Sequence, residues 1–159
     1  MRLEDDRPDE TERRNNIKFE RLVSGLFSPE HYAIERKPVT PAADQPYRDP
    51  DIIIKHKKSN QRFAVVCVFR QDFSQGQSVG SDVIRWSSPN QIKHYQDFQS
   101  SKKLPVFVVA GVKGFPDNPE HMYCIPLDSA KTPEIPPSVY GGHRKPVNKP
   151  FFYMNGKLK

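Results

Sequence analysis

The chain has 159 residues, of which 35% are hydrophobic, 28% are charged and 16 are prolines. This length suits a single domain with one hydrophobic core. No stretch approaches the ~18 apolar residues that a membrane span needs, and no charged-then-apolar leader opens the chain, so we expect a soluble, cytoplasmic protein with no membrane partner.

Charge is distributed unevenly along the chain. The formal net charge is +6, with −2 in residues 1–50 and +8 in residues 51–159. A basic surface favours a polyanion such as DNA through contacts with phosphates. Lysines that only maintain solubility give the same composition, so charge alone leaves both interpretations open.

The N-terminal region divides into a polar tail and a helix. Residues 1–15 are mostly charged or polar, which predicts a disordered tail in front of a single domain at 16–159. Five apolar residues then follow at the i, i+3, i+4, i+7 and i+8 spacing of an amphipathic helix. They are Phe19, Leu22, Val23, Leu26 and Phe27. Ser28-Pro29 ends this helix.

Five runs are typical of strands and one is typical of a second helix. The strands are predicted at 31–36, 52–54, 63–69, 105–112 and 122–127. The 63–69 run is continuously apolar, which indicates a central strand covered on both faces and paired in a hairpin with 52–54. A helix is predicted to start at Ser88, with a proline in its first turn and Gln91 three residues after the cap.

The remaining segments predict loops around this core. Residues 38–50 and 71–87 read as loops, and the proline-rich stretch 129–150 reads as an extended segment on the surface. Residues 151–153 are expected to dock as a terminal strand. The element order indicates an α/β domain with a mixed central sheet flanked by α-helices.

Neither cysteine chemistry nor zinc is expected. Cys67 and Cys124 both lie in apolar runs, which favours buried, reduced thiols over a disulfide. The five histidines show no ligand spacing with one another or with the cysteines, so we expect no zinc site.

Six segments in order carry a resemblance to a known family. They read FERLVSGLF, PDIII, RFAVVCVFRQ, IRWSSPNQIKHYQDF, LPVFVVAGVKG and PEHMYCIPL. Between about Asn16 and Tyr153 the chain resembles a bacterial group of PD-(D/E)XK nucleases. The resemblance implies the restriction-endonuclease-like fold, in which a mixed central β-sheet is flanked by α-helices.

The family's chemistry explains which residues matter. Phosphodiester hydrolysis uses a divalent metal, commonly held by carboxylates, to polarise the phosphate and activate water. In the family an Asp begins one hairpin strand, and a Glu-x-Lys triplet on the next strand places both side chains on one face. The resemblance assigns the Asp to Asp51, a helical carboxylate to Glu20 and the family's Gln to Gln91.

The Glu-x-Lys triplet is missing from this chain. The resemblance places its metal-binding Glu on Val66 and its Lys on Val68. Asp51 and Glu20 alone would hold a metal weakly or not at all. Each assignment has a plainer alternative: Asp51 as a turn residue, Glu20 as a solvated helix charge and Gln91 as a member of a capping box.

These observations predict a catalytically degenerate nuclease-like domain that binds double-stranded DNA or a protein partner and needs no cofactor. One alternative is an active, Mg²⁺-dependent endonuclease with a relocated site that uses Lys93 or Lys55. A second alternative is a purely structural interaction domain.

Several basic or aromatic residues are candidate nucleic-acid contacts. They are Lys55, Lys57, Lys58, Arg70, Arg85 and Trp86, together with the tail bases Arg144, Lys145 and Lys149. The alternatives are that Trp86 covers a sheet edge and that the cations are simply solvated.

Overall fold

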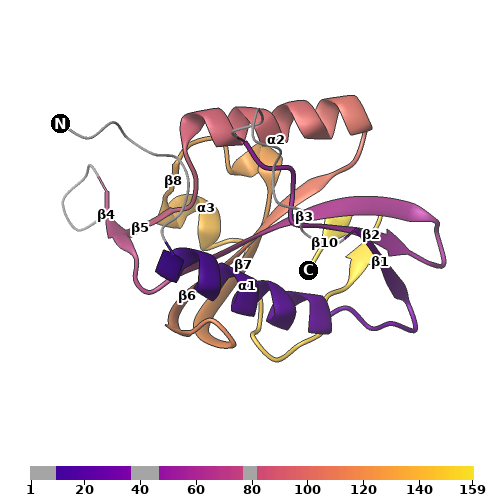
Figure 1. The fold of residues 1–159 in the computed structure, drawn as a ribbon, viewed down its shortest axis with the longest axis horizontal. Coiled ribbons are helices and arrows are strands. Elements are labelled where there is room, and N and C mark those ends of the chain that lie inside the picture. The colour runs from indigo at the N-terminus through magenta and orange to yellow at the C-terminus, as the bar shows by residue number, and fades with distance from the viewer. Residues whose placement is uncertain (1–9, 37–46, 77–81) are drawn as a thin grey trace.

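A five-stranded mixed sheet forms the centre of the molecule (Figure 1). The computed structural model describes residues 10–36, 47–76 and 82–159. The elements that build and cover the sheet are α1 (Glu10–Gly25), β1 (Tyr32–Arg36), β2 (Ile52–His56), β3 (Gln61–Arg70), α2 (Pro89–Lys102), β6 (Val106–Phe115) and β7 (Asn118–Pro126). The strand order is β1-β2-β3-β6-β7, which confirms the predicted α/β class with a mixed central sheet.

The uninterrupted apolar strand β3 lies in the middle of the sheet. β1, β2 and β3 pair antiparallel, as the predicted hairpin requires, and α2 then returns the chain so that β6 lies parallel to β3. β6 and β7 form a second hairpin. Its turn needs Gly114, whose φ is +74° and where a Cβ would lie 2.8 Å from the Asn118 carbonyl oxygen.

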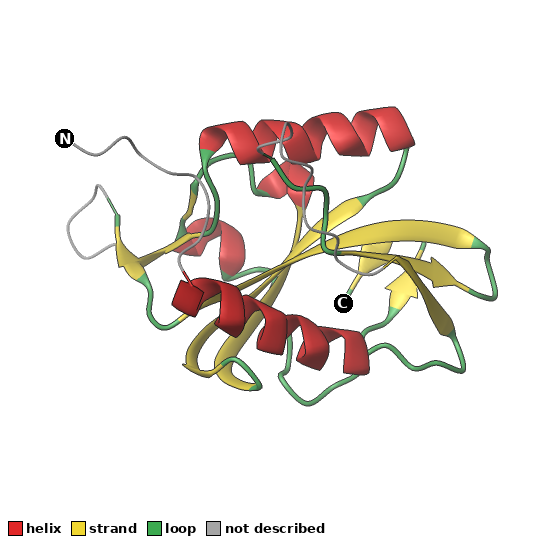
Figure 2. Cartoon of the chain, in the orientation of Figure 1, coloured by secondary structure: helices red, strands yellow, loops and turns green. Residues whose placement is uncertain are grey.

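The two long helices cover opposite faces of the sheet (Figure 2). The core on the α1 side includes Phe19, Val23, Val65, Cys67, Phe69, Phe107 and Val109. The core on the α2 side includes Ala64, Val66, Val68, Ile92, Tyr95, Phe98 and Val108. Alternate residues of β3 therefore divide between the faces. None of the helices in the described ranges has the length and apolar content needed to cross a membrane.

The two cysteines are buried and reduced, as predicted. Cys67 and Cys124 both pair with Val109, one from each side, so they stand in one row across β3, β6 and β7. Two strand spacings amount to roughly 10 Å, which exceeds the ~7 Å that a disulfide allows between Cα atoms.

The structure corrects the boundaries of two predicted segments. The first helix begins at Glu10 and ends at Gly25, so 10–15, predicted as disordered, is helical; residues 1–9 lie outside the described residues. The predicted 71–87 loop contains the short strands β4 (Ser74–Gln75) and β5 (Asp82–Arg85), which pair with each other. Each holds too few residues to give a strand pattern.

The proline-rich stretch 129–150 is also more structured than predicted. After the short η1 (Leu127–Ser129) it contains β8 (Glu134–Ile135), which pairs with β5, and the helical turn α3 (Pro137–Tyr140). Ile135 and Tyr140 are buried, so this segment contributes to the core and does not merely wrap the surface.

The chain ends in a small hairpin. The predicted terminal strand exists as β9 (Tyr153–Met154), but it pairs with β10 (Lys157–Leu158) and not with the central sheet. Asn155 and Gly156 form the connection with φ values of 53° and 78°. Asn-Gly is the preferred sequence for a two-residue turn with two positive φ angles.

Candidate functional site

Asp51 lies immediately before the first residue of β2, beside the part of β3 that extends beyond the end of β2. Ile52 pairs with Val65, and the next backbone N–H of β3 that points this way belongs to Cys67. Asp51 Oδ2 accepts a 2.6 Å hydrogen bond from that N–H. The carboxylate, only 6% exposed, therefore takes the place that a longer β2 would fill with a backbone carbonyl.

Arg48 neutralises this buried carboxylate. Its Nη2 lies 2.6 Å from Asp51 Oδ1, while the arginine side chain keeps 35% of its surface exposed. Both carboxylate oxygens thus accept hydrogen bonds from donors in the chain, and one of these donors carries a full positive charge. The Arg48 guanidinium therefore lies directly beside the Asp51 carboxylate.

Helix α2 holds the Arg48 backbone in position. Gln91 Oε1 accepts from the Arg48 N–H at 2.9 Å, and Gln91 Nε2 donates to the Arg48 carbonyl at 2.7 Å. His94 Nε2 lies 2.7 Å from Asp49 Oδ1. Ser88 does cap α2 by accepting from the Gln91 N–H, but the Gln91 side chain bonds to Arg48, so only half of a capping box forms.

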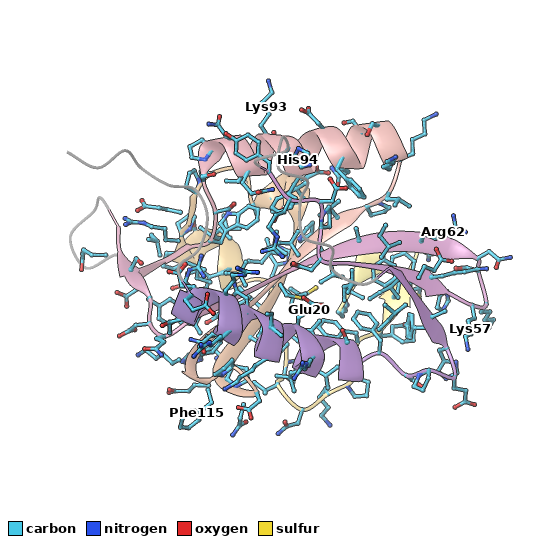
Figure 3. The ribbon with its side chains drawn as sticks, in the orientation of Figure 1. Glu20, Lys57, Arg62, Lys93, His94 and Phe115 are labelled. Carbon is cyan, nitrogen blue, oxygen red and sulfur yellow. The ribbon has the colours of Figure 1, made fainter. Side chains whose placement is uncertain are left out.

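Glu20 approaches the same carboxylate from α1. It is half-buried and lies between the helix and the sheet (Figure 3). Loss of solvent raises its pKa to about 7, with a further contribution from the negative charge of Asp51, while Arg48 and Arg21 oppose the rise. The structure therefore brings Glu20, Asp51 and, through Arg48, Gln91 into one neighbourhood.

Val66 and Val68 are only 2% and 5% exposed and belong to the core beneath α2. Ile53 packs into the same core, whereas Asp51 precedes β2 and its carboxylate lies beside the edge of β3, where it accepts from the Cys67 N–H. At the two positions where the resemblance implies a Glu and a Lys, the chain therefore has apolar side chains in the core. Over the described ranges, no group of three or more His, Cys, Asp or Glu residues is arranged to hold a metal ion.

Sequence reasoning missed Arg48 and the influence of the Asp51 charge on Tyr95. Tyr95 follows Gln91 by four residues, which places both on one face of α2, and this spacing was the available signal. Burial raises the pKa of the Tyr95 hydroxyl far above its usual value, and the Asp51 charge adds to the rise. Arg48 gave no signal beyond lying three residues before Asp51.

Three of the predicted nucleic-acid contacts have partners within the chain. Trp86 is 2% exposed, stacks on Tyr95 and donates its indole N–H to the Thr132 carbonyl, so it is wrong as a base-stacking residue. Arg70 donates to the carbonyls of Arg85 and Trp86. Arg85 forms an ion pair with Glu134.

The lysines of the β2–β3 hairpin keep more freedom. Lys57 and Lys58 are exposed at the turn and Lys55 is half-buried on β2. Lys57 Nζ donates to the Pro29 carbonyl at 2.6 Å, a contact at an exposed position. Figure 3 shows Lys57 and Arg62 at the same end of the molecule.

Comparison of the chain with protein-family models, with curated proteins and with solved structures gave no match.

Proposed function

We propose that this chain is a PD-(D/E)XK-like module that has lost hydrolytic activity and binds duplex DNA without cutting it. The order α1, β1, β2, β3, α2, β6 supports the proposal, as does the position of Asp51 at the start of a hairpin strand. The convergence of Glu20, Asp51 and Gln91 from three separate elements also supports it.

The single observation that carries the proposal is the engagement of both Asp51 oxygens by Arg48 and the Cys67 N–H. Metal-assisted hydrolysis needs a cation with free positions for water and phosphate. Here a guanidinium already balances the carboxylate. Losing one electrostatic catalytic group commonly costs ~10²–10³ in rate, and Val66 and Val68 stand in place of two such groups.

A relocated catalytic site receives no support from the lysines named for it. Lys93 is exposed and points outward from α2, away from Glu20 (Figure 3). Lys55 faces Arg62 across the β2–β3 hairpin. Binding without cleavage therefore remains the single proposal.

Exposed cations at the β2–β3 turn are the proposed contacts with DNA phosphates. Phosphate contacts need flexible positive groups rather than a precise pocket, and each one makes binding weaker at higher salt. Lys57 and Lys58 are exposed and meet this requirement, whereas Arg70 donates to two backbone carbonyls. Arg85 is exposed as well, although it forms an ion pair with Glu134.

Fluorescence anisotropy with a labelled DNA duplex in EDTA tests the proposal. We expect binding that weakens steeply with salt, that needs no metal and that drops several-fold in K57A/K58A. A parallel incubation with Mg²⁺ or Mn²⁺ is expected to leave the duplex intact. Cleavage that D51N abolishes would overturn the loss of activity, and absence of binding at low salt would overturn the DNA partner and leave a protein partner.

A further inference from the structure

A pocket of about 710 Å³ lies between the end of β7, the segment 142–150 and the C-terminal hairpin. This volume falls within the ~300–1,000 Å³ range of small-molecule sites. The pocket contains none of the residues around Asp51 and none of the lysines at the β2–β3 turn. The inference drawn from it stands independently of the proposed function.

The pocket wall is fixed by a buried cation. Lys145 is 4% exposed, and its Nζ donates to the carbonyls of Pro146, Lys149 and Pro150 while lying 4.7 Å from the centre of the Phe151 ring. Burial lowers the pKa of this ammonium group. These contacts fold the segment into a tight loop of defined shape.

Backbone hydrogen bonds hold both sides of the pocket in shape. The Cys124 N–H donates to the His143 carbonyl and the Lys145 N–H to the Met122 carbonyl, which joins the segment to β7. Phe152 and Lys159 exchange a pair of backbone hydrogen bonds, which closes the C-terminal hairpin. The pocket is therefore a built feature of the domain.

Positive charge gathers around the opening. Arg144, Lys149, Lys157 and Lys159 line the pocket, all four are exposed, and the lining contains no Asp or Glu. No carboxylate in the described part of the chain forms an ion pair with any of the four side chains. Several unpaired cations around one concavity attract a multiply charged anion.

An aromatic ring accompanies these cations. Phe152 lines the pocket with 56% of its surface exposed, so its ring is accessible to a ligand. A nucleobase stacks on such a ring and carries phosphate charge to the cations, whereas a fatty carboxylate brings a single charge to a lining with four cations. We propose that this pocket binds a nucleotide, with its phosphate among the cations and its base against Phe152.

Isothermal titration with dAMP, deoxyadenosine and inorganic phosphate tests the proposal. We expect dAMP to bind at least ten-fold more tightly than either fragment, because only the nucleotide engages both the cations and the ring. Equal affinity for phosphate and dAMP would overturn the proposal by reducing the pocket to a simple anion site.

Variants locate the binding. K149A/K157A is expected to weaken dAMP about ten-fold or more, and F152A is expected to lower dAMP affinity about ten-fold while leaving phosphate binding unchanged. The matched control K102A/K131A removes the same charge at exposed positions outside the pocket and is expected to bind dAMP as the wild type does. Equal loss in the pocket and control variants would contradict the assignment. All these positions are exposed, and circular dichroism verifies folding.

A second titration identifies the source of the nucleotide. A 5′-phosphorylated oligonucleotide is compared with its dephosphorylated form, again with K149A/K157A. If the wild type prefers the phosphorylated form, the variant loses this preference and dAMP binds weakly, then the pocket binds the end of a DNA strand. Tight dAMP binding assigns it to a free nucleotide. Binding of neither ligand would overturn the proposal.

Discussion

The Asp51 site and the C-terminal pocket differ in whether their charged side chains have charge partners. At the first, a buried carboxylate is balanced by Arg48 and hydrogen-bonded to the Cys67 backbone. In the second, exposed cations line a concavity whose lining contains no Asp or Glu side chain. A charged group that already has a charge partner within the protein attracts a ligand less strongly than an unpaired charged group does. The comparison therefore favours a structural role for the Asp51 charges and agrees with the proposed ligand contacts at the pocket and the β2–β3 turn.

The largest expected effect comes from removing the cation at the Asp51 site. R48A leaves the 8%-exposed Asp51 side chain without its charge partner and is expected to lower the free energy of unfolding by about 3 kcal/mol. Urea denaturation measures the change. R14A, whose ion pair with Glu10 is 74% and 70% exposed, is the matched control with an expected loss below ~0.5 kcal/mol. Similar losses of unfolding free energy in R48A and R14A would contradict the special role of the Arg48–Asp51 pair.

The buried ammonium of the pocket wall gives the next effect. K145M keeps most of the volume but removes the donor to three carbonyl oxygens, so we expect a loss of about 2 kcal/mol. K149M, at an exposed position, is expected to leave stability within ~0.5 kcal/mol of the wild type. Thermal and urea unfolding distinguish the two. An unperturbed K145M would contradict the role of Lys145 in building the wall.

Glu20 makes stability depend on pH. Its pKa is raised from an ordinary value of 4.5 to about 7 by burial and then by Asp51, so the folded state holds the proton more tightly than the unfolded chain. The stability that this group contributes is present below pH 4.5, declines as the pH rises towards 7 and is gone above it.

Replacing this carboxyl tests the electrostatic coupling. E20Q is expected to flatten the decline and to stabilise the protein by about 1 kcal/mol at pH 8, less than the full shift implies because the carboxyl is half exposed. E30Q, at an exposed position, serves as the control. A decline that persists unchanged in E20Q assigns the pH dependence to another group.

The smallest expected effect is a gain of metal sensitivity. In R48A the Asp51 carboxylate loses its guanidinium partner while Glu20 stays nearby, so millimolar Mg²⁺ is expected to recover less than about 1 kcal/mol of the lost stability. The same addition to the wild type is expected to leave the melting temperature unchanged. Comparing both proteins by differential scanning fluorimetry measures this difference. An equal shift in both would contradict displacement of the metal by Arg48.

Local patterns in the sequence predicted the core of this fold well. The apolar run that became β3 predicted a central strand, and the Ser88-Pro89 start predicted α2 because caps act within one turn. Asn155-Gly156 carries an equally local turn signal, which is typical of the hairpin that the structure shows there. Short strands such as β5 depend on tertiary partners and left no pattern.

The candidate site was only partly predictable. The resemblance indicated Asp51, Glu20 and Gln91, which the fold brings together. Arg48 could not be identified, because its role depends on how α2 holds the backbone beside Asp51. The pocket could not be identified either, because residues as distant along the chain as Phe107 and Lys157 meet only after the C-terminal hairpin folds.

The central claim is that the buried Asp51 carboxylate pairs with Arg48 and does not bind a divalent cation. Titration of Mn²⁺ into the wild type and into D51N by isothermal calorimetry tests it most directly, since D51N keeps an acceptor for the Cys67 N–H. We predict the same negligible heat from both proteins. Stoichiometric binding to the wild type that D51N abolishes would contradict the account.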